Sequence, residues 1–305
     1  MTTATRVLRG GTRRSPLARW QTTLIREALL LHGVASAEIP LTTEGDRVLD
    51  RPLPEIGGKG VFTEALEEAL RAGAIDFAVH SLKDLPIEQP ADLIVAAVCM
   101  RSDPRDVLVA RGKHTLGSLP PGATVGTSST RRIAQLRAVR PDLGLRPLRG
   151  NVDTRVRKAQ DGEYDGIVIA AAGVERLGLG AAITEYLPFE VMLPAPGQGA
   201  LAVQCRAGDQ PTRELLAALD DPDARATTDA ERGFLARLGG GCAAPIAALA
   251  EVSNEHRTLR LTGLIAALDG TQVVRVAGSG PKGEPLELAR RLAGQAIQRG
   301  ARDLL

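Results

Sequence analysis

Short apolar runs alternate along this chain with longer segments of helical periodicity. The runs 76–80, 93–98, 107–110 and 166–170 are brief and rich in aliphatic residues, which is typical of buried strands. Alternation of strand and helix predicts an α/β fold in which helices cover sheets. At 305 residues the chain is long enough for two or three domains, each with a core of its own.

The first strand and helix carry clear boundary signals. A strand is expected over residues 5–8, followed by a turn at the two glycines 10–11. Ser15-Pro16 is typical of a helix N-cap followed by the first helical residue, and Gly33 is typical of a helix end. The sequence therefore predicts a helix over residues 16–32.

Further elements follow the same rhythm. The additional helices expected cover residues 62–71, 130–139, 226–238 and 285–299, and the additional strands cover 123–126, 200–204, 259–264 and 272–276. The strand at 76–80 ends in a loop, and α/β proteins usually bind their ligands at such strand ends.

The chain is expected to form three domains. Extended crossings near 100–104 and 194–199 predict that the chain leaves a first α/β lobe, builds a second and returns, with a ligand cleft between the lobes. The first lobe is assigned to residues 1–99 and 200–217, and the second to residues 104–193. Residues 222–305 should form a small α+β domain after an acidic linker at 220–223.

Composition excludes several classes of protein. There are 38 basic and 36 acidic residues and only seven aromatic ones, which argues against a nucleic-acid-binding surface. No run of about 18 apolar residues is present, so no membrane span is expected. Three widely spaced cysteines without a C-x-x-C pair favour neither a zinc site nor a disulfide framework, and fit a reducing cytoplasm.

The net charge of +2 conceals a basic segment. Residues 131–158 hold nine basic and two acidic residues, a local charge of +7, so the rest of the chain carries −5. This segment follows Gly126-Thr127-Ser128-Ser129, where a strand gives way to a helix. Free backbone N–H groups, hydroxyls and the guanidiniums of Arg131 and Arg132 are expected to converge there on an anion. The alternative is a solvated helix face with an ordinary cap.

Lys83 and Asp84 follow the end of the strand at 76–80. A carboxylate at this point could stabilise a developing positive charge or take up a proton. The alternative is a turn in which Asp84 caps backbone N–H groups.

Cys242 follows three consecutive glycines, Gly239 to Gly241. Such a loop permits an unusual backbone or a close approach by another group, so a reactive or covalently modified thiol is one interpretation. A plain loop thiol is the other. Cys99 and Cys205 end apolar runs and are expected to lie in the core.

Seven short motifs, in order between residues 9 and about 245, match one known family. They are Arg13 with Ser15-Pro16-Leu17-Ala18, Gly57-Gly58-Lys59-Gly60, His80-Ser81-Leu82-Lys83-Asp84, Gly126-Thr127-Ser128-Ser129 with Arg131-Arg132, Leu148-Arg149-Gly150-Asn151, Pro196-Gly197-Gln198-Gly199, and Gly239-Gly240-Gly241-Cys242. With these motifs the chain resembles the porphobilinogen deaminases, also called hydroxymethylbilane synthases.

The resemblance implies a fold and a reaction. It implies two lobes similar to those of periplasmic solute-binding proteins around a cleft, plus a small α+β C-terminal domain. It implies that four porphobilinogen molecules are deaminated and joined into a linear hydroxymethylbilane, with release of ammonia, in tetrapyrrole biosynthesis. It also implies a dipyrromethane cofactor attached by a thioether bond to Cys242, no metal, and a monomeric cytoplasmic enzyme.

The resemblance further implies roles for individual residues. Asp84 matches the catalytic carboxylate, which would stabilise positive charge on the pyrroles and assist proton transfer. Residues that match cofactor-binding groups are Cys242, Lys83, Asp84, Ser129, Arg131, Arg132 and Arg155. Residues that match substrate-binding groups are Arg13, Ser15, Arg149, Arg155, Arg176, Lys59 and Gln198.

Two positions depart from the family pattern. Glu55 stands where bacterial members often have a second loop lysine, which puts a catalytic role for that position in doubt. Leu82 replaces a methionine, which exchanges one apolar side chain for another.

Two other classes of protein are weighed against this interpretation. A solute-binding protein or a regulator's effector domain would also have two lobes, but the sequence shows neither a secretory signal nor a helix-turn-helix. An acyl-transfer enzyme with Cys242 as nucleophile would need a base, and His80 is the only histidine in a motif.

Overall fold

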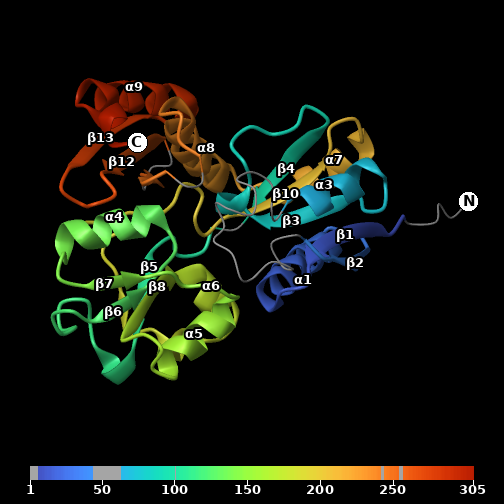
Figure 1. The fold of residues 1–305 in the computed structure, drawn as a ribbon. Coiled ribbons are helices and arrows are strands. Elements are labelled where there is room, and N and C mark those ends of the chain that lie inside the picture. Colours follow the sequence, from blue (N-terminus) through green and yellow to red (C-terminus); the bar gives the residue numbers. More distant parts are fainter. Residues whose placement is uncertain (1–5, 44–62, 100, 242–243, 254–256) are drawn as a thin grey trace, which may run out of the picture. The chain divides into compact units, whose positions relative to one another are not determined.

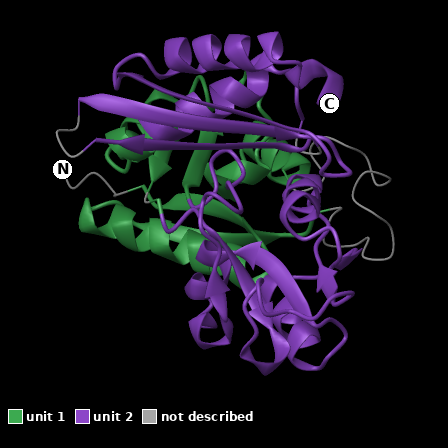
Figure 2. Cartoon of the chain, turned by 90° about the vertical axis from the view of Figure 1, so that its left-hand side faces the viewer, with its two compact units in different colours: residues 1–101, 200–225 green, residues 102–199, 226–305 purple. Residues whose placement is uncertain are grey.

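The computed structural model describes residues 6–43, 63–99, 101–241, 244–253 and 257–305 (Figure 1). Three sheets organise this described part of the chain, two of five strands and one of three. By their internal contacts the residues divide into two compact units (Figure 2). Unit 1 comprises Met1–Arg101 and Ala200–Arg225, and unit 2 comprises Ser102–Gly199 and Ala226–Leu305. The α/β prediction is therefore confirmed.

Unit 1 is built on a mixed sheet with the strand order β2-β1-β3-β10-β4. Its strands are β1 (Leu8–Arg13), β2 (Ser36–Leu41), β3 (Phe77–Ser81), β4 (Leu93–Cys99) and β10 (Leu201–Arg206). Its helices are α1 (Pro16–Leu31), α3 (Glu64–Arg71) and α7 (Gln210–Ala217). The first three strands run parallel, and β10 is antiparallel to both of its neighbours.

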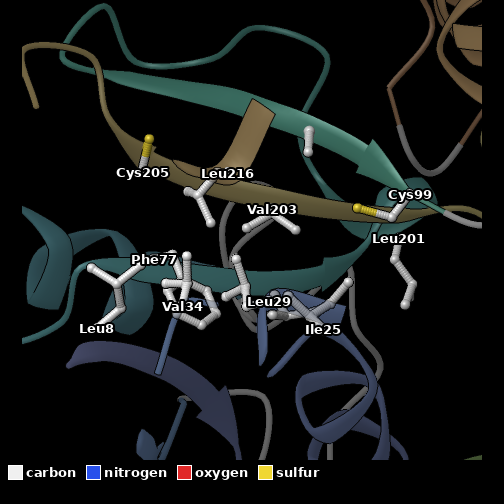
Figure 3. Packing of buried hydrophobic residues seen from close by; sticks show 12 residues of the cluster. Leu8, Ile25, Leu29, Val34, Phe77, Cys99, Leu201, Val203, Cys205 and Leu216 are labelled. Atoms are coloured by element: carbon white, nitrogen blue, oxygen red, sulfur yellow. The ribbon is translucent and has the colours of Figure 1, made fainter. Parts of the chain in front are cut away.

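Helices cover both faces of this sheet. On one face Ile25 of α1 and Leu216 of α7 pack with Phe77 and Val203 (Figure 3). On the other face α3 contributes Leu66 and other buried aliphatic residues. Cys99 and Cys205 are buried in the first of these cores, so the prediction for both thiols is confirmed.

The prediction for the first strand was wrong. The strand β1 runs over Leu8–Arg13 and passes straight through the two glycines that were expected to turn the chain. A Cβ atom on Gly10 would lie 2.5 Å from the ring of Phe77, and one on Gly11 would lie 2.3 Å from the side chain of Ile75. These glycines are therefore required for close packing inside the sheet, not for a turn.

Unit 2 contains a second mixed sheet with the strand order β7-β6-β8-β5-β9. The strands are β5 (Asp106–Ala110), β6 (Thr124–Gly126), β7 (Gly144–Arg146), β8 (Gly166–Ala170) and β9 (Glu185–Tyr186). The helices are α4 (Thr130–Val139), α5 (Val152–Gln160) and α6 (Ala171–Arg176). Helices α5 and α6 share one core, and α4 contributes Leu136 to another.

The C-terminal part of unit 2 is an antiparallel sheet of β11 (Ile246–Val252), β12 (Thr258–Ala266) and β13 (Val273–Pro281). It is accompanied by α8 (Pro222–Arg237) and α9 (Pro285–Gln298). Ala247 and Leu264 of this sheet pack against Ala134 of α4 and Leu193. This shared apolar core explains why the C-terminal sheet belongs to the same compact unit as the second five-stranded sheet.

The expected acidic linker at 220–223 is an ordered helix start. The side chain of Asp221 accepts hydrogen bonds from the backbone N–H groups of Asp223 and Ala224, which caps α8. Asp220 accepts hydrogen bonds from Val98 N and from the Arg225 side chain. These residues were predicted to form a linker, whereas in the structure they begin α8.

No helix among the described residues is long and apolar enough to cross a membrane.

Candidate functional site

Asp84 lies on the surface of unit 1, on a single 3₁₀ turn over Leu82–Asp84 that follows β3 directly. Leu82 and Leu85 are buried in an apolar cluster beneath the turn, which fixes its position. Within the described ranges the Asp84 carboxylate makes no hydrogen bond or ion pair, so it does not cap the turn. The structural alternative from the sequence is therefore not seen, and this carboxylate is open to solvent.

The residues just before this turn are held from α1. The Gln21 side chain, 3% exposed, donates a hydrogen bond of 2.9 Å to Ser81 Oγ. Ser15 is the N-cap of α1, as predicted, and its hydroxyl accepts a hydrogen bond from Ala18 N. Arg13 is the last residue of β1 and is half-buried. Unit 1 thus presents Arg13, Ser15, Lys83 and Asp84 from strand ends and a helix start.

The start of α4 lies in unit 2, at the point where the sequence predicts an anion site. The helix begins at Thr130, and its N-cap Ser129 makes no side-chain hydrogen bond to the first turn. The first-turn N–H groups of a helix without such a cap attract anions.

The two arginines of this turn have a protein partner that the sequence did not reveal. Arg131 Nη1 and Arg132 Nη2 each lie 2.7 Å from a carboxylate oxygen of Asp106, which is fully buried. Burial alone would raise the pKa of Asp106, but the two guanidiniums outweigh that effect and hold the pKa well below its usual range. A charged residue at the first position of a buried strand was the signal that could have found Asp106.

Gln198 joins the same cluster. Its side-chain N–H group donates hydrogen bonds to Asp106 Oδ1 at 2.9 Å and to Pro104 O at 2.7 Å. Gln198 is 1% exposed, so its described contacts are with the protein's own crossing segments. We call Asp106, Arg131, Arg132 and Gln198 the Asp106 cluster.

Arg176 also binds the crossing segments. Its Nη2 group donates to Gly199 O at 2.6 Å and to Ser102 Oγ at 3.0 Å. The side chain is 8% exposed, and burial lowers its pKa to about 10.

Arg149 and Arg155 lie around the start of α5. Arg155 Nε donates a 2.7 Å hydrogen bond to Gly150 O, and the Ser128 hydroxyl bonds both backbone groups of Leu148 at 2.9 Å. These bonds place the loop that carries Arg149 next to the segment leading into α4.

The basic segment 131–158 is less uniform than its charge suggests. Besides the two arginines on Asp106, Arg140 pairs with Asp142 and Arg137 donates to Leu268 O. Arg146 lies over the ring of Tyr164. Several of the nine basic residues therefore stabilise unit 2, and the sequence interpretation of a single anion-binding patch was too broad.

Three predicted positions cannot be placed. Lys59, Glu55 and Cys242 lie outside the described residues. The glycines before Cys242 are partly described: Gly239 has a φ of +70°, and a Cβ atom on Gly240 would lie 2.4 Å from the Ile246 side chain. The positive φ favours glycine at 239, and a side chain at 240 would displace the end of the Ile246 side chain.

His80 is the histidine that the acyl-transfer alternative would need as a base. In the described part of the chain, no group of three or more His, Cys, Asp or Glu side chains is arranged to hold a metal. His80 is 6% exposed, and burial lowers its pKa to about 4.

Two five-stranded mixed sheets, with arginines near helix starts and an exposed carboxylate at a strand end, define an α/β protein whose polar groups gather at strand ends, where such folds usually bind ligands. A family model described as "Porphobilinogen deaminase, dipyromethane cofactor binding domain" matches residues 8–214, and a second, "Porphobilinogen deaminase, C-terminal domain", matches residues 226–298. The chain belongs to the porphobilinogen deaminase family. It is a transferase of tetrapyrrole biosynthesis with a dipyrromethane cofactor-binding domain.

Curated relatives agree over nearly their whole length. The porphobilinogen deaminase of Roseiflexus castenholzii is 54% identical over 297 residues, which cover 97% of each chain. That of Mycobacterium tuberculosis is 49% identical, with 98% of each chain covered.

Solved structures of other proteins are more distantly similar. A putative methionine-binding lipoprotein from Bacillus subtilis has a TM-score of 0.44 at 12% identity, covering 73% of this chain and 93% of its own. The VFT2 domain of BvgS from Bordetella pertussis has a TM-score of 0.42 at 16% identity, covering 70% of this chain and 86% of its own.

Proposed function

We propose that this chain deaminates porphobilinogen and joins four molecules of it into linear hydroxymethylbilane, with Asp84 as the catalytic carboxylate. The proposed role of Asp84 rests on one observation: the residue is held in place, but its carboxylate has no described partner. A buried turn holds the residue at the end of β3, yet within the described ranges its oxygens make no hydrogen bond or ion pair. A carboxylate placed in this way can accept hydrogen bonds from pyrrole N–H groups and move protons at the reacting carbon.

The donor chemistry of the described residues fits a dipyrromethane, whose side chains are carboxylates. Bidentate guanidinium groups and uncapped helix N–H groups are the donors that carboxylates prefer. We assign cofactor carboxylate binding to Lys83, Ser129, Arg131, Arg132 and Arg155. Arg13, Ser15 and Arg149 are assigned to the carboxylates of substrate and growing chain, together with Lys59.

Arg176 and Gln198 fit a supporting role better than direct substrate binding. Both are buried, and their hydrogen bonds to Gly199 O and Pro104 O go to the protein backbone. Mutations at these positions should therefore act through the backbone that they hold.

Cys242 is proposed as the attachment point of the cofactor. It follows α8 and precedes β11 in sequence, and Gly239 before it has a positive φ that favours glycine. When bound, the dipyrromethane supplies the pyrrole α-carbon to which new substrate units are added. The residues of this chain would hold its carboxylates and exchange protons with it.

Three further assignments belong to this proposal. Three domains, at 1–99 with 200–217, at 104–193 and at 222–305, follow the three sheets. A monomer and a cytoplasmic location are expected of this family.

The experiment that tests the proposed function is intact-protein mass spectrometry of the purified chain. The mass should exceed that of the bare chain by two linked pyrrole units, and Cys242→Ser should abolish the increment. Cys99→Ser is the matched control, because Cys99 is a buried core thiol, and it should keep the increment. A wild-type chain that shows the bare mass and forms no hydroxymethylbilane from porphobilinogen would contradict the proposal.

A further inference from the structure

The C-terminal sheet of unit 2 has two edge strands, β11 and β13, and only the edge of β11 is covered in the described part of the chain. Ala248 N donates a hydrogen bond to Pro194 O at 3.1 Å. Ala250 N donates to Glu231 Oε1 at 2.7 Å. Protein groups outside the sheet therefore occupy the outer side of β11. Among the described residues β13 pairs with β12 alone, so no strand lies on its outer side.

Hydrogen bonds at the two ends of β13 show which of its backbone groups face outward. At one end Ala267 N donates to Gln272 O. At the other end Lys282 N donates to Arg257 O. Residues of an antiparallel pair alternate between bonding to the partner strand and facing away from it, so the even-numbered residues of β13 bond to β12. The backbone groups that face outward belong to the odd-numbered residues, Val273, Arg275, Ala277, Ser279 and Pro281.

The usual means of protecting an edge strand are missing from β13. Proteins protect such edges with short strands, bulges, prolines or charged side chains that point along the edge. The strand β13 has nine residues in one continuous register with β12, and its proline, Pro281, is the last of them. Its one charged side chain, Arg275, donates instead to Phe189 O and Glu190 O. A strand of this kind pairs readily with another strand unless something else occupies its outer groups.

Two arginines of α9 occupy outward-facing carbonyl groups of β13. Helix α9 lies on one face of the sheet (Figure 1), where Leu292 contacts the strand at Gly278. From this helix Arg291 Nη2 donates to Ser279 O at 2.8 Å. Arg299 Nη1 donates to Arg275 O at 3.1 Å. Each exposed side chain thus places a charged group at the outer edge of the strand.

The two occupied carbonyl groups lie symmetrically about Ala277, two residues away on either side. Suppose that two copies of β13 pair antiparallel about a two-fold axis, with Ala277 opposite its counterpart. The Arg275 N–H group of each copy would then bond to Ser279 O of the other copy, and the Ser279 N–H group to Arg275 O. The two arginines of α9 occupy these same acceptors. They would also bring like charges from the two copies face to face.

We propose that β13 is a self-association edge and that Arg291 and Arg299 prevent a second copy of this chain from pairing with it. Without the two arginines, a second copy would add its own β13 in antiparallel orientation, with Ala277 opposite Ala277. Because protein groups cover the edge of β11, this sheet offers one open edge per copy, and the product is a closed dimer. The inference does not depend on the proposed function.

Sedimentation equilibrium of a double variant tests this inference. Arg291→Gln with Arg299→Gln removes both hydrogen-bonded arginines. Arg290→Gln with Arg302→Gln is the matched control, because it removes two exposed arginines from the same region that have no described bond to β13. The dissociation constant of the dimer should be at least about ten times lower for the first double variant than for the control and for wild type. Circular dichroism checks that all three proteins are folded.

Substitutions at Ala277 test whether the dimer forms through the edge of β13. Ala277→Pro removes an N–H group that does not bond to β12, which is the position where an edge strand tolerates proline. Added to the first double variant, it should return the dissociation constant to the wild-type value. Ala277→Lys should do the same, because it places like charges directly opposite each other at the centre of the pairing.

Three results would overturn the inference. The first is a double variant that associates no more strongly than the control. The second is a dimer that persists with both Ala277→Pro and Ala277→Lys. The third is the formation of oligomers larger than a dimer, which one open edge per copy does not allow. If the double variant does not fold, Arg291→Gln and Arg299→Gln are measured singly, and each should lower the dissociation constant; no change in either would refute the proposal.

Discussion

Arg176 holds the main-chain oxygen of Gly199 through a hydrogen bond of 2.6 Å from its Nη2 group. The same Nη2 group also donates to Ser102 Oγ, and Ser102 N donates to Gly199 O. Arg176 therefore links two segments that are distant in sequence. Gly199 has a φ of +91°, and a Cβ atom there would lie 2.4 Å from Ser102 O. Two of the three places where the chain passes from one compact unit to the other, next to Ser102 and Gly199, are therefore bound together.

Replacing Arg176 should destabilise the protein. Arg176→Gln removes a charged donor from a buried carbonyl, and the expected loss is about 2 kcal/mol in the free energy of unfolding. Urea unfolding measures this loss, with the exposed Arg290→Gln as a control that should unfold like wild type. An Arg176→Gln variant of unchanged stability but raised KM for porphobilinogen would show instead that the residue chiefly binds substrate.

Gly270 should not tolerate a side chain. Its φ is +76°, and a Cβ atom would lie 2.5 Å from Ala138 N in α4. Gly122 is a matched control in the same unit, since its φ is +77° and nothing lies within 4 Å of its Cβ position. Both alanine variants incur backbone strain, but Gly270→Ala should lose about 2 kcal/mol more stability than Gly122→Ala, because it opens the contact between the β12–β13 hairpin and α4. If urea unfolding shows equal losses of stability for the two variants, the contact between Gly270 and α4 can shift to accept a methyl group at no measurable cost.

Stability should fall in mild acid partly because of His80. Burial lowers its pKa to about 4 from the ordinary 6.5, while Gln204 opposes the shift and the charge of Arg13 adds to it. Below pH 6.5 the unfolded chain takes up a proton that the folded chain does not, so the free energy of unfolding falls until pH 4, by at most about 1.4 kcal/mol per pH unit.

Comparing histidine variants isolates the contribution of His80 to the pH dependence of the free energy of unfolding. His80→Gln should show a shallower fall of stability between pH 6.5 and 4.5 than wild type, measured by urea unfolding at several pH values. The exposed His32→Gln is the control and should keep the wild-type slope. Identical slopes for all three proteins would mean that His80 does not titrate differently on folding.

Asp84→Asn should separate catalysis from folding. The variant keeps the shape of an exposed side chain whose carboxylate has no described hydrogen bond, so it should fold and carry the cofactor mass as wild type does. The rate of porphobilinogen consumption should drop at least about 100-fold, in line with loss of a general acid–base group. Asp84→Glu retains a carboxylate and should keep part of the activity, whereas near-normal turnover of Asp84→Asn would remove Asp84 from the catalytic role.

The sequence by itself determined the class of fold and the local signals. The helix that starts at Pro16 and stops before Gly33 was predicted from its capping residues, and the strand at Gly166–Ala170 and the helix at Thr130–Val139 from apolar periodicity. Helix caps and apolar periodicity depend only on residues that are close in sequence, so they can be recognised without knowing the fold. The same holds for the short motifs that carried the family resemblance.

Only the tertiary structure decided what the charged and glycine residues do. The sequence predicts a turn at Gly10, yet Gly10 is a strand residue. Glycine is needed there because the ring of Phe77 occupies the space that a side chain would take. Arg131 and Arg132 look in sequence like a pair directed at a ligand, yet both hydrogen-bond to Asp106, which lies 25 and 26 positions away. Packing and ion pairing depend on residues that folding brings together from distant positions, and no local pattern records those partners.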